Sequence, residues 1–288
     1  MSERRSWKFS DGVLLAGLTA LAVAATWSIW SDIFGWAIQD EEQSHVLLAP
    51  AIAAWLVWVR RERLRYCKPR WTIWGPLLVA AGWLLAWQGF FGERMLFWHF
   101  GALLIVAGAA LTVVGMNFVR NFMPAAFALL FLMPIPGMIR MRIALPLQEV
   151  TAKITHFCME LFGAPVAQHG NLLSINGVDV AVAEACNGMR MVAALALVSY
   201  AFVFSTPMRM SVRIFILAIS PLVAIVCNVI RLVPTVLMYG YSDVETAEAF
   251  HDISGWAMLP IALAIVWGVF ALLRWIEVPI TPYQASEE

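Results

Sequence analysis

The sequence predicts an all-α polytopic membrane protein: one integral membrane domain over residues 1–288 with about eight transmembrane helices, an outer-face amphipathic helix and a small β-hairpin. Hydrophobic residues make up 61% of the chain and charged residues only 13%, with a mean hydropathy of +0.77. This composition excludes an ordinary soluble domain. The chain also holds 14 Trp and 17 Phe, and aromatic rings of this kind collect at the two surfaces of a bilayer.

Eight apolar segments predict the membrane helices. They lie at residues 12–31, 45–59, 71–91, 96–116, 122–139, 189–205, 214–238 and 254–273. The segments 45–59 and 122–139 are the shortest and contain prolines, which is typical of helices supported by their neighbours. The first segment is too long for the apolar region of a cleaved signal peptide, so we interpret it as a retained helix.

The basic residues predict the orientation. With a cytoplasmic N-terminus, the inner segments carry thirteen of the 19 basic residues, from Arg4 to Arg274. The opposite side is acidic, with runs at residues 40–42 and 243–252. An even number of helices then returns the C-terminal tail, residues 275–288, to the cytoplasm. We therefore expect a bacterial inner-membrane protein that contacts lipid on all sides and has both termini in the cytoplasm.

The long polar segment at residues 140–188 falls on the outer, periplasmic side. Its first part predicts an amphipathic helix, because apolar residues recur every three or four positions at Ile143, Leu147, Val150, Ile154, Phe157 and Leu161. Gly163 and Pro165 end this helix. Two short runs follow, Leu172–Ile175 and Val178–Val182, separated by Asn176 and Gly177. Because this dipeptide favours a tight turn, the two runs predict a β-hairpin.

Cys186 follows the hairpin at the outer N-terminus of the next membrane helix, and Asn187 comes directly after it. The helix dipole and the free N–H groups at such a position lower the pKa of a thiol and favour a nucleophilic thiolate. A buried structural thiol is the equal alternative at this point. A disulfide with Cys158 is a further alternative, because the outer compartment of a bacterium is oxidising.

Arg231 lies inside an apolar membrane segment, near its predicted outer end. A guanidinium in this position is costly and normally faces a partner or a wet cavity. Asn228 lies one turn earlier on the same face, and Pro234 removes a backbone hydrogen bond nearby. Snorkelling of Arg231 to the lipid headgroups is the alternative, but it does not account for Asn228.

His251 is the third candidate. The sequence Ser242–Glu245 predicts a capping box, so that a helix begins there and continues through His251 into the last membrane segment. Glu248, one turn earlier on that helix, could orient the imidazole. The predicted topology places Cys186, Arg231 and His251 on the outer side. A thiol, a cation and an imidazole are the groups that acyl transfer through a thioester requires.

Three sequence stretches resemble the signature regions of the exosortase and archaeosortase family. They are VAEACNGMRM at residues 182–191, NVIRL at residues 228–232 and FHDISGW at residues 250–256, in the family's order and spacing. The resemblance implies a membrane cysteine peptidase or transpeptidase with Cys186, Arg231 and His251 as its catalytic residues. Asn187 departs from the family pattern, which more often has serine after the cysteine.

The resemblance also implies the partners. Bacterial members process PEP-CTERM-type C-terminal sorting signals, which consist of a Pro-Glu-Pro-like motif, a transmembrane helix and a basic tail. The acyl group would pass to an unknown acceptor amine. We expect no cofactor, no metal and no nucleic-acid partner, because the sequence has no nucleotide-binding glycine loop and no zinc-type cysteine pairing.

A non-enzymatic transporter or exopolysaccharide-export component is the alternative function. In that protein Arg231 would bind an anionic substrate along the transport path. The sequence shows no pair of broken helices and no inverted repeat of the kind that many transporters have. The enzyme reading is therefore favoured.

Overall fold

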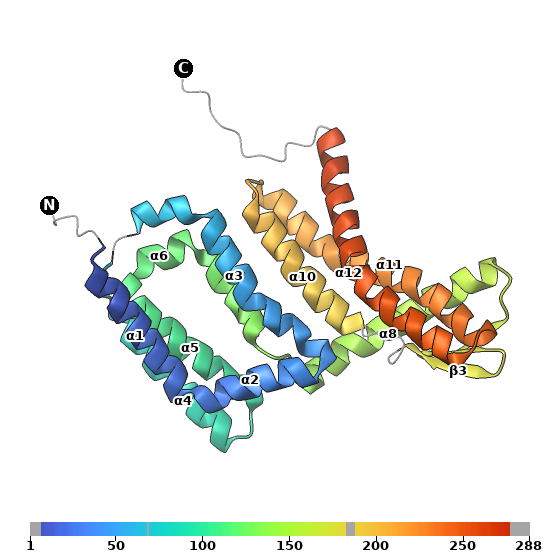
Figure 1. Cartoon of the computed structure of the whole chain (residues 1–288), viewed down its shortest axis with the longest axis horizontal. Coiled ribbons are helices and arrows are strands. Elements are labelled where there is room, and N and C mark those ends of the chain that lie inside the picture. Colours follow the sequence, from blue (N-terminus) through green and yellow to red (C-terminus); the bar gives the residue numbers. More distant parts are fainter. Residues whose placement is uncertain (1–6, 68, 183–187, 277–288) are drawn as a thin grey trace. The chain divides into compact units, whose positions relative to one another are not determined.

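The computed structural model describes residues 7–67, 69–182 and 188–276, most of which are helical (Figure 1). The chain divides into two compact units, residues 1–136 and residues 137–288. Each unit has its own core, and each is described separately below.

The first unit is built from apolar helices joined by short 3₁₀ segments (Figure 1). Its elements are α1 (Phe9–Ala25), α2 (Trp27–Gln39), η1 (Glu41–Leu47), α3 (Leu48–Val59), η2 (Arg61–Tyr66), α4 (Trp74–Phe91), α5 (Met95–Val114), α6 (Met116–Asn121), α7 (Met123–Ala128) and η3 (Leu129–Leu132). Leu18 and Ala22 of α1 pack against Ile105 and Ala109 of α5, so α1 covers one side of α5.

Glycines bring α4 and α5 into close contact. A Cβ added to Gly82 of α4 would lie 2.7 Å from the carbonyl oxygen of Gly101 on α5, and one added to Gly108 of α5 would lie 2.8 Å from that of Gly75 on α4. Small residues at such crossings let two helix backbones approach, which is how helices commonly associate in lipid. The seven-residue spacing of these glycines keeps the contact on one face of each helix.

The second unit contains four long helices and a three-stranded sheet. Its elements are α8 (Gly137–Leu161), β1 (Val166–His169), β2 (Leu172–Ile175), β3 (Val178–Ala181), α10 (Gly188–Ser205), α11 (Met210–Tyr241) and α12 (Val244–Trp275). Helices α10, α11 and α12 share one apolar core, which includes Leu195, Ile216, Cys227 and Ala262.

The predicted hairpin is confirmed, and the structure adds a third strand. Strands β2 and β3 pair in antiparallel register, and Asn176 and Gly177 between them have positive φ angles of 51° and 81°. Two positive φ angles in a row define the type I′ turn that an Asn-Gly sequence favours. Strand β1 pairs with β2 on its other side. The sequence analysis missed β1 because its VAQH sequence is short and carries no clear apolar alternation.

The helix over residues 137–161 is present, but it does not bury the predicted apolar face. Its buried residues are Ala144, Thr151, Ala152, Thr155 and Met159. Most of the predicted apolar face is exposed, namely Ile143, Val150, Ile154, Phe157 and Leu161. Small and β-branched side chains thus face the core of the second unit. The interfacial position of this helix stays a prediction.

Among the described residues, fewer clear membrane spans are found than the eight that we predicted. By length and apolar composition, α5, α11 and α12 can each cross a membrane. The number rises to five if each of two bent helix pairs forms one broken span. These pairs are α1 with α2, and Met123–Leu132 with α8. Two shorter apolar helices cover Gln43–Val59 and Val192–Ser205. Eight spans are therefore not confirmed, whereas every predicted apolar segment is largely helical.

Thr26 explains one of these breaks. It joins α1 and α2, which meet at 75°, and its φ and ψ angles of −114° and 24° are not helical. Its hydroxyl donates to the carbonyl oxygen of Ala22 (2.7 Å) and accepts from the indole N–H of Trp30 (2.9 Å). A threonine that bonds backward in this way bends or interrupts a helix, and the hydropathy pattern does not reveal it.

The α4–α5 contact makes a testable prediction. We expect Gly82→Ala to destabilise the protein by about 1–3 kcal/mol, because the new methyl group has no space against the α5 backbone. Gly17→Ala on α1 is the matched control, because a Cβ there meets nothing within 4 Å. Thermal unfolding of both variants in the same detergent measures the difference. Equal melting temperatures for the two variants would contradict the close packing.

A second prediction concerns the start of α12. Asp243 caps this helix: its carboxylate accepts from the backbone N–H of Thr246 (2.9 Å), and this bond lowers the pKa of Asp243. A lowered folded-state pKa means that the stabilisation is present above the unfolded pKa and is lost as the pH falls through the folded pKa. We expect the loss of thermal stability in Asp243→Ala to be largest near neutral pH and to shrink in strong acid. Asp243→Asn, which keeps an uncharged cap, should show a smaller loss at neutral pH. A loss that does not change with pH would refute the role of the carboxylate charge.

Candidate functional site

The candidate site forms where α11 meets α12 in the second unit. Arg231 and Asn228 lie one turn apart on α11, and each is only 6% exposed. The sequence analysis placed them on the same face, and both are buried there. A buried guanidinium needs hydrogen-bond acceptors around it, and α12 supplies two of them.

Arg231 is held by one turn of α12. Its Nε donates to the hydroxyl oxygen of Ser254 (3.2 Å), and its Nη2 donates to the backbone carbonyl oxygen of His251 (3.1 Å). The Ser254 hydroxyl in turn donates to the same His251 carbonyl (2.9 Å). The guanidinium is thus fixed to the helical turn that carries His251 by two hydrogen bonds.

The backbone around Arg231 is also fixed. The hydroxyl of Thr235 donates to the carbonyl oxygen of Arg231 (2.7 Å), at the position where Pro234 interrupts the regular bonding of α11. Thr235 and Leu232 are fully buried. The orientation of Arg231 is therefore set by packing of its own helix as well as by α12.

The start of α12 sets which residues face α11. We predicted a capping box that begins at Ser242, but the cap is Asp243, which accepts from both the backbone N–H and the hydroxyl of Thr246 (2.9 Å each). The helix does begin at the predicted place. From this start, Ala247, Ser254 and Met258 fall on one buried face, with His251 at its edge.

His251 lies at the edge of this buried face. Its side chain is 23% exposed, and its Nδ1 lies 3.3 Å from a carboxylate oxygen of Asp252. We expected Glu248 to orient the ring, and Glu248 is exposed one turn earlier on α12. The Asp252 side chain is 79% exposed, and a long contact in water holds a ring only weakly.

Cys186 and Asn187 lie outside the described residues. The described chain on either side of them ends at Val182 and resumes at Gly188, where α10 begins. Val182 is buried in one cluster with Leu232 and Val236 of α11. The segment that contains Cys186 therefore starts from the same part of α11 that holds Arg231.

The other cysteines have structural surroundings. Cys67 and Cys227 are buried, Cys158 is half-buried, and all three are free thiols. Burial raises the pKa of the Cys67 thiol, which makes it a poor nucleophile. Within the described part of the chain, no three His, Cys, Asp or Glu side chains are grouped so as to hold a metal ion.

The sequence analysis missed Ser254 and Asp252. Both lie in the FHDISGW stretch, and Ser254 comes three residues after His251. That spacing places it on the same helical face, so periodicity could have identified it. Asp252 has no such signal, because a residue adjacent to His251 normally points to a different side of the helix.

A comparison with protein families identifies the family of the chain. The family model described as transmembrane exosortase (Exosortase_EpsH) matches residues 30–268. No curated protein and no solved structure gives a significant match. The matched region includes Cys186, Arg231 and His251 and covers both units of the fold. The chain therefore belongs to the transmembrane exosortase family.

Proposed function

We propose that this multi-pass membrane protein is a cysteine peptidase or transpeptidase that cleaves PEP-CTERM-type C-terminal sorting signals, with Cys186 as the nucleophile. Membership of the family supports an exosortase-type role. The observation that carries the proposal is the buried guanidinium of Arg231, bound to the same turn of α12 that carries His251. A cation fixed to the helical turn that carries a histidine suits the charge changes of acyl transfer.

The reaction proceeds through a thioester. The Cys186 thiolate bonds to the scissile carbonyl carbon, the C–N bond breaks, and His251 gives a proton to the leaving amine. An acceptor amine then attacks the carbonyl carbon of the thioester and passes its proton to His251. The C–S bond breaks, and the Cys186 thiolate is released. Water in place of the amine would give simple hydrolysis. No step requires a cofactor.

Arg231 stabilises negative charge in this scheme. The thiolate and the tetrahedral oxyanion are anions, and a cation held rigidly in an apolar region stabilises them more than a hydrated one. Ser254 is the positioning residue, because its hydroxyl accepts from Nε of Arg231 and also bonds the His251 carbonyl. One hydroxyl thereby couples the cation to the turn that carries the imidazole.

His251 needs one nitrogen for the reaction. Asp252 lies beside Nδ1, and a carboxylate there favours a proton on that nitrogen. Nε2 is then the nitrogen that exchanges protons with the substrate. In the proposed topology the site faces the periplasm, both termini lie in the cytoplasm, and the substrate's transmembrane helix approaches through the bilayer.

The central prediction is a loss of processing on substitution of the three residues. A tagged protein that ends in a sorting signal is produced together with each variant, and its cleavage is followed by gel mobility. We expect Cys186→Ala to abolish cleavage, and Arg231→Ala and His251→Ala to slow it by about 10²–10⁴-fold.

Cys158→Ala is the matched control, because this half-buried thiol lies in the same unit. It should leave cleavage intact, whereas a functional Cys158–Cys186 disulfide would make both cysteine variants inactive. Full cleavage with Cys186→Ala would refute the cysteine mechanism. No cleavage by the wild-type protein would instead favour the transporter alternative, in which Arg231 binds an anion and Cys186 is dispensable.

Ser254 gives a separate prediction about positioning. We expect Ser254→Ala to slow cleavage by roughly tenfold, because the guanidinium loses an acceptor and a charge-assisted hydrogen bond. Ser254→Thr keeps a hydroxyl and should retain most of the activity. The pH–rate profile of both variants distinguishes positioning from a structural role. The acidic limb of this profile reports the ionisation of the Cys186 thiol to the thiolate, so displacement of the Arg231 cation should shift that limb. An unshifted profile with equal activity in both variants would contradict the role.

A further inference from the structure

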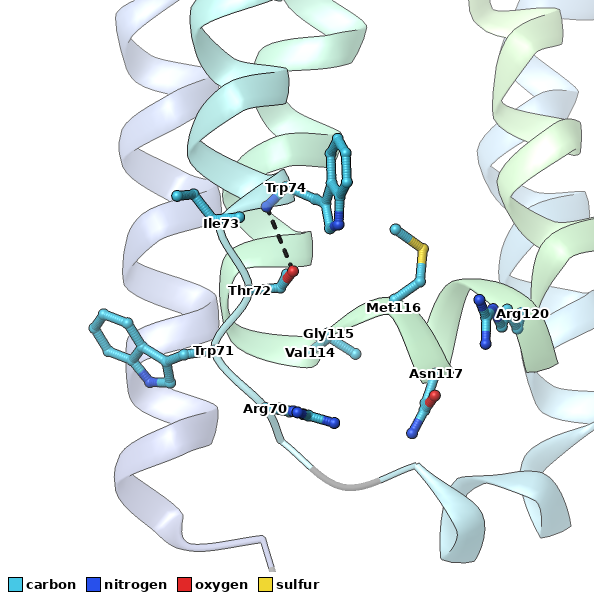
Figure 2. Close-up of a pocket in the computed structure, with 10 residues that line it drawn as sticks. All are labelled: Arg70, Trp71, Thr72, Ile73, Trp74, Val114, Gly115, Met116, Asn117 and Arg120. Atoms are coloured by element: carbon cyan, nitrogen blue, oxygen red, sulfur yellow. Dashed lines mark hydrogen bonds between the residues drawn. The ribbon is translucent and has the colours of Figure 1, made fainter.

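A second cationic pocket lies in the first unit, apart from the candidate catalytic residues. It has a volume of about 390 Å³, which is within the range of small-molecule sites. The irregular segment at residues 70–73, which precedes α4, and the junction of α5 with α6 form its two walls (Figure 2). The lining residues are Arg70, Trp71, Thr72, Ile73, Trp74, Val114, Gly115, Met116, Asn117 and Arg120.

The backbone holds the two walls together. Gly115 has a φ angle of 77°, and a Cβ at this position would lie 2.7 Å from the carbonyl oxygen of Arg70. Only glycine combines this conformation with so close an approach. The pocket therefore lies beside the α4–α5 packing contact, and the close approach of Gly115 to Arg70 helps to set its shape.

Both walls contribute positive charge. Arg70 comes from the irregular segment before α4 and Arg120 from α6, and Figure 2 shows Arg70 and Asn117 on opposite sides of the opening. Among the described residues, neither guanidinium forms an ion pair with a carboxylate. Thr72 and Asn117 add polar groups. Two arginines with neutral donors are suited to a phosphate group.

The apolar lining indicates that the phosphate belongs to a lipid. Trp71, Ile73 and Trp74 are 65%, 72% and 60% exposed, and the indole of Trp71 points away from the pocket (Figure 2). They lie beside the end of α5, a helix of 20 residues that can cross a membrane. Tryptophan at the end of a span lies at the headgroup level, where acyl chains meet phosphates.

A larger basic surface surrounds the pocket. Cys67 is buried between η2 and α6, and its thiol contacts the carbonyl oxygens of Arg63 (3.5 Å) and Asn117 (4.0 Å). These contacts bring the arginines of η2 close to the pocket wall. The η2 arginines are not part of the pocket lining, so they can serve as a charge-matched comparison for Arg70 and Arg120.

We propose that this pocket binds the phosphate headgroup of an anionic phospholipid, with its acyl chains lying along Trp71 and Ile73. Arg70 and Arg120 hold the phosphate oxygens from two sides. This site is independent of the proposed peptidase chemistry, since it lies in the other unit and uses none of the same residues.

Lipid titration of the purified full-length protein tests the site. Native mass spectrometry measures binding of dimyristoyl phosphatidylglycerol, with dimyristoyl phosphatidylcholine as the neutral lipid. We expect phosphatidylglycerol to bind at least about tenfold more tightly, and the double variant Arg70→Gln with Arg120→Gln to lose about tenfold or more of that affinity.

The matched control is the double variant Arg63→Gln with Arg65→Gln, which removes the same charge from η2 outside the pocket. It should keep most of the affinity for phosphatidylglycerol. Equal losses in both double variants would overturn the proposal in favour of general electrostatic attraction. A thermal-shift measurement with inorganic phosphate forms the last arm: stabilisation equal to that by phosphatidylglycerol would overturn the lipid assignment, and a much smaller effect supports it.

Discussion

The buried charge of Arg231 is the constraint on which the second unit depends. A guanidinium inside an apolar helix is costly unless its N–H groups find acceptors, and in lipid no water replaces them. Ser254 and the carbonyl oxygen of His251 supply these acceptors from α12. Sliding or rotating α12 along α11 would break both bonds, so the cost of the buried charge fixes the register of the two helices. That register is also what places His251 beside the cation.

The sheet extends the same constraint toward the segment that contains Cys186. The amide of Asn176 donates to the carbonyl oxygen of Gly240 (3.0 Å), and Gly240 leaves space for Ile175, so β2 is fixed to the end of α11. The backbone N–H of Val182 donates to the carbonyl oxygen of Asn171 (2.9 Å), which fixes the end of β3 to the turn between β1 and β2. The chain therefore leaves the sheet from a fixed point beside Leu232, the neighbour of Arg231. A small sheet of this kind serves to position the chain, since its own core is too small to be stable alone.

Features with a strong local cause could be predicted from the sequence. The Asn176-Gly177 turn, the helical state of the apolar segments and the polar face of Asn228 and Arg231 follow from backbone preferences and from periodicity. Features that depend on tertiary contacts could not be predicted in this way. Thr26 breaks a helix through the hydrogen bonds of its hydroxyl, and α8 buries its small residues in place of its apolar stripe. Strand β1 forms by pairing with the edge of β2. At the site, the sequence indicated the helix of His251 and the face that carries Ser254, but the bond of Ser254 to Arg231 depends on the α11–α12 register.

The two units meet the same physical problem in different ways. Lipid chains are as apolar as leucine, so burial of apolar surface contributes little to helix association within a bilayer. The first unit associates α4 with α5 through glycines that bring the backbones together, which leaves its polar residues at the ends of the helices. The second unit associates α11 with α12 through hydrogen bonds from a buried cation as well as through packing. Close packing stabilises a scaffold without adding chemistry. A buried cation costs stability but provides a fixed charge, held in place by the two helices that bury it.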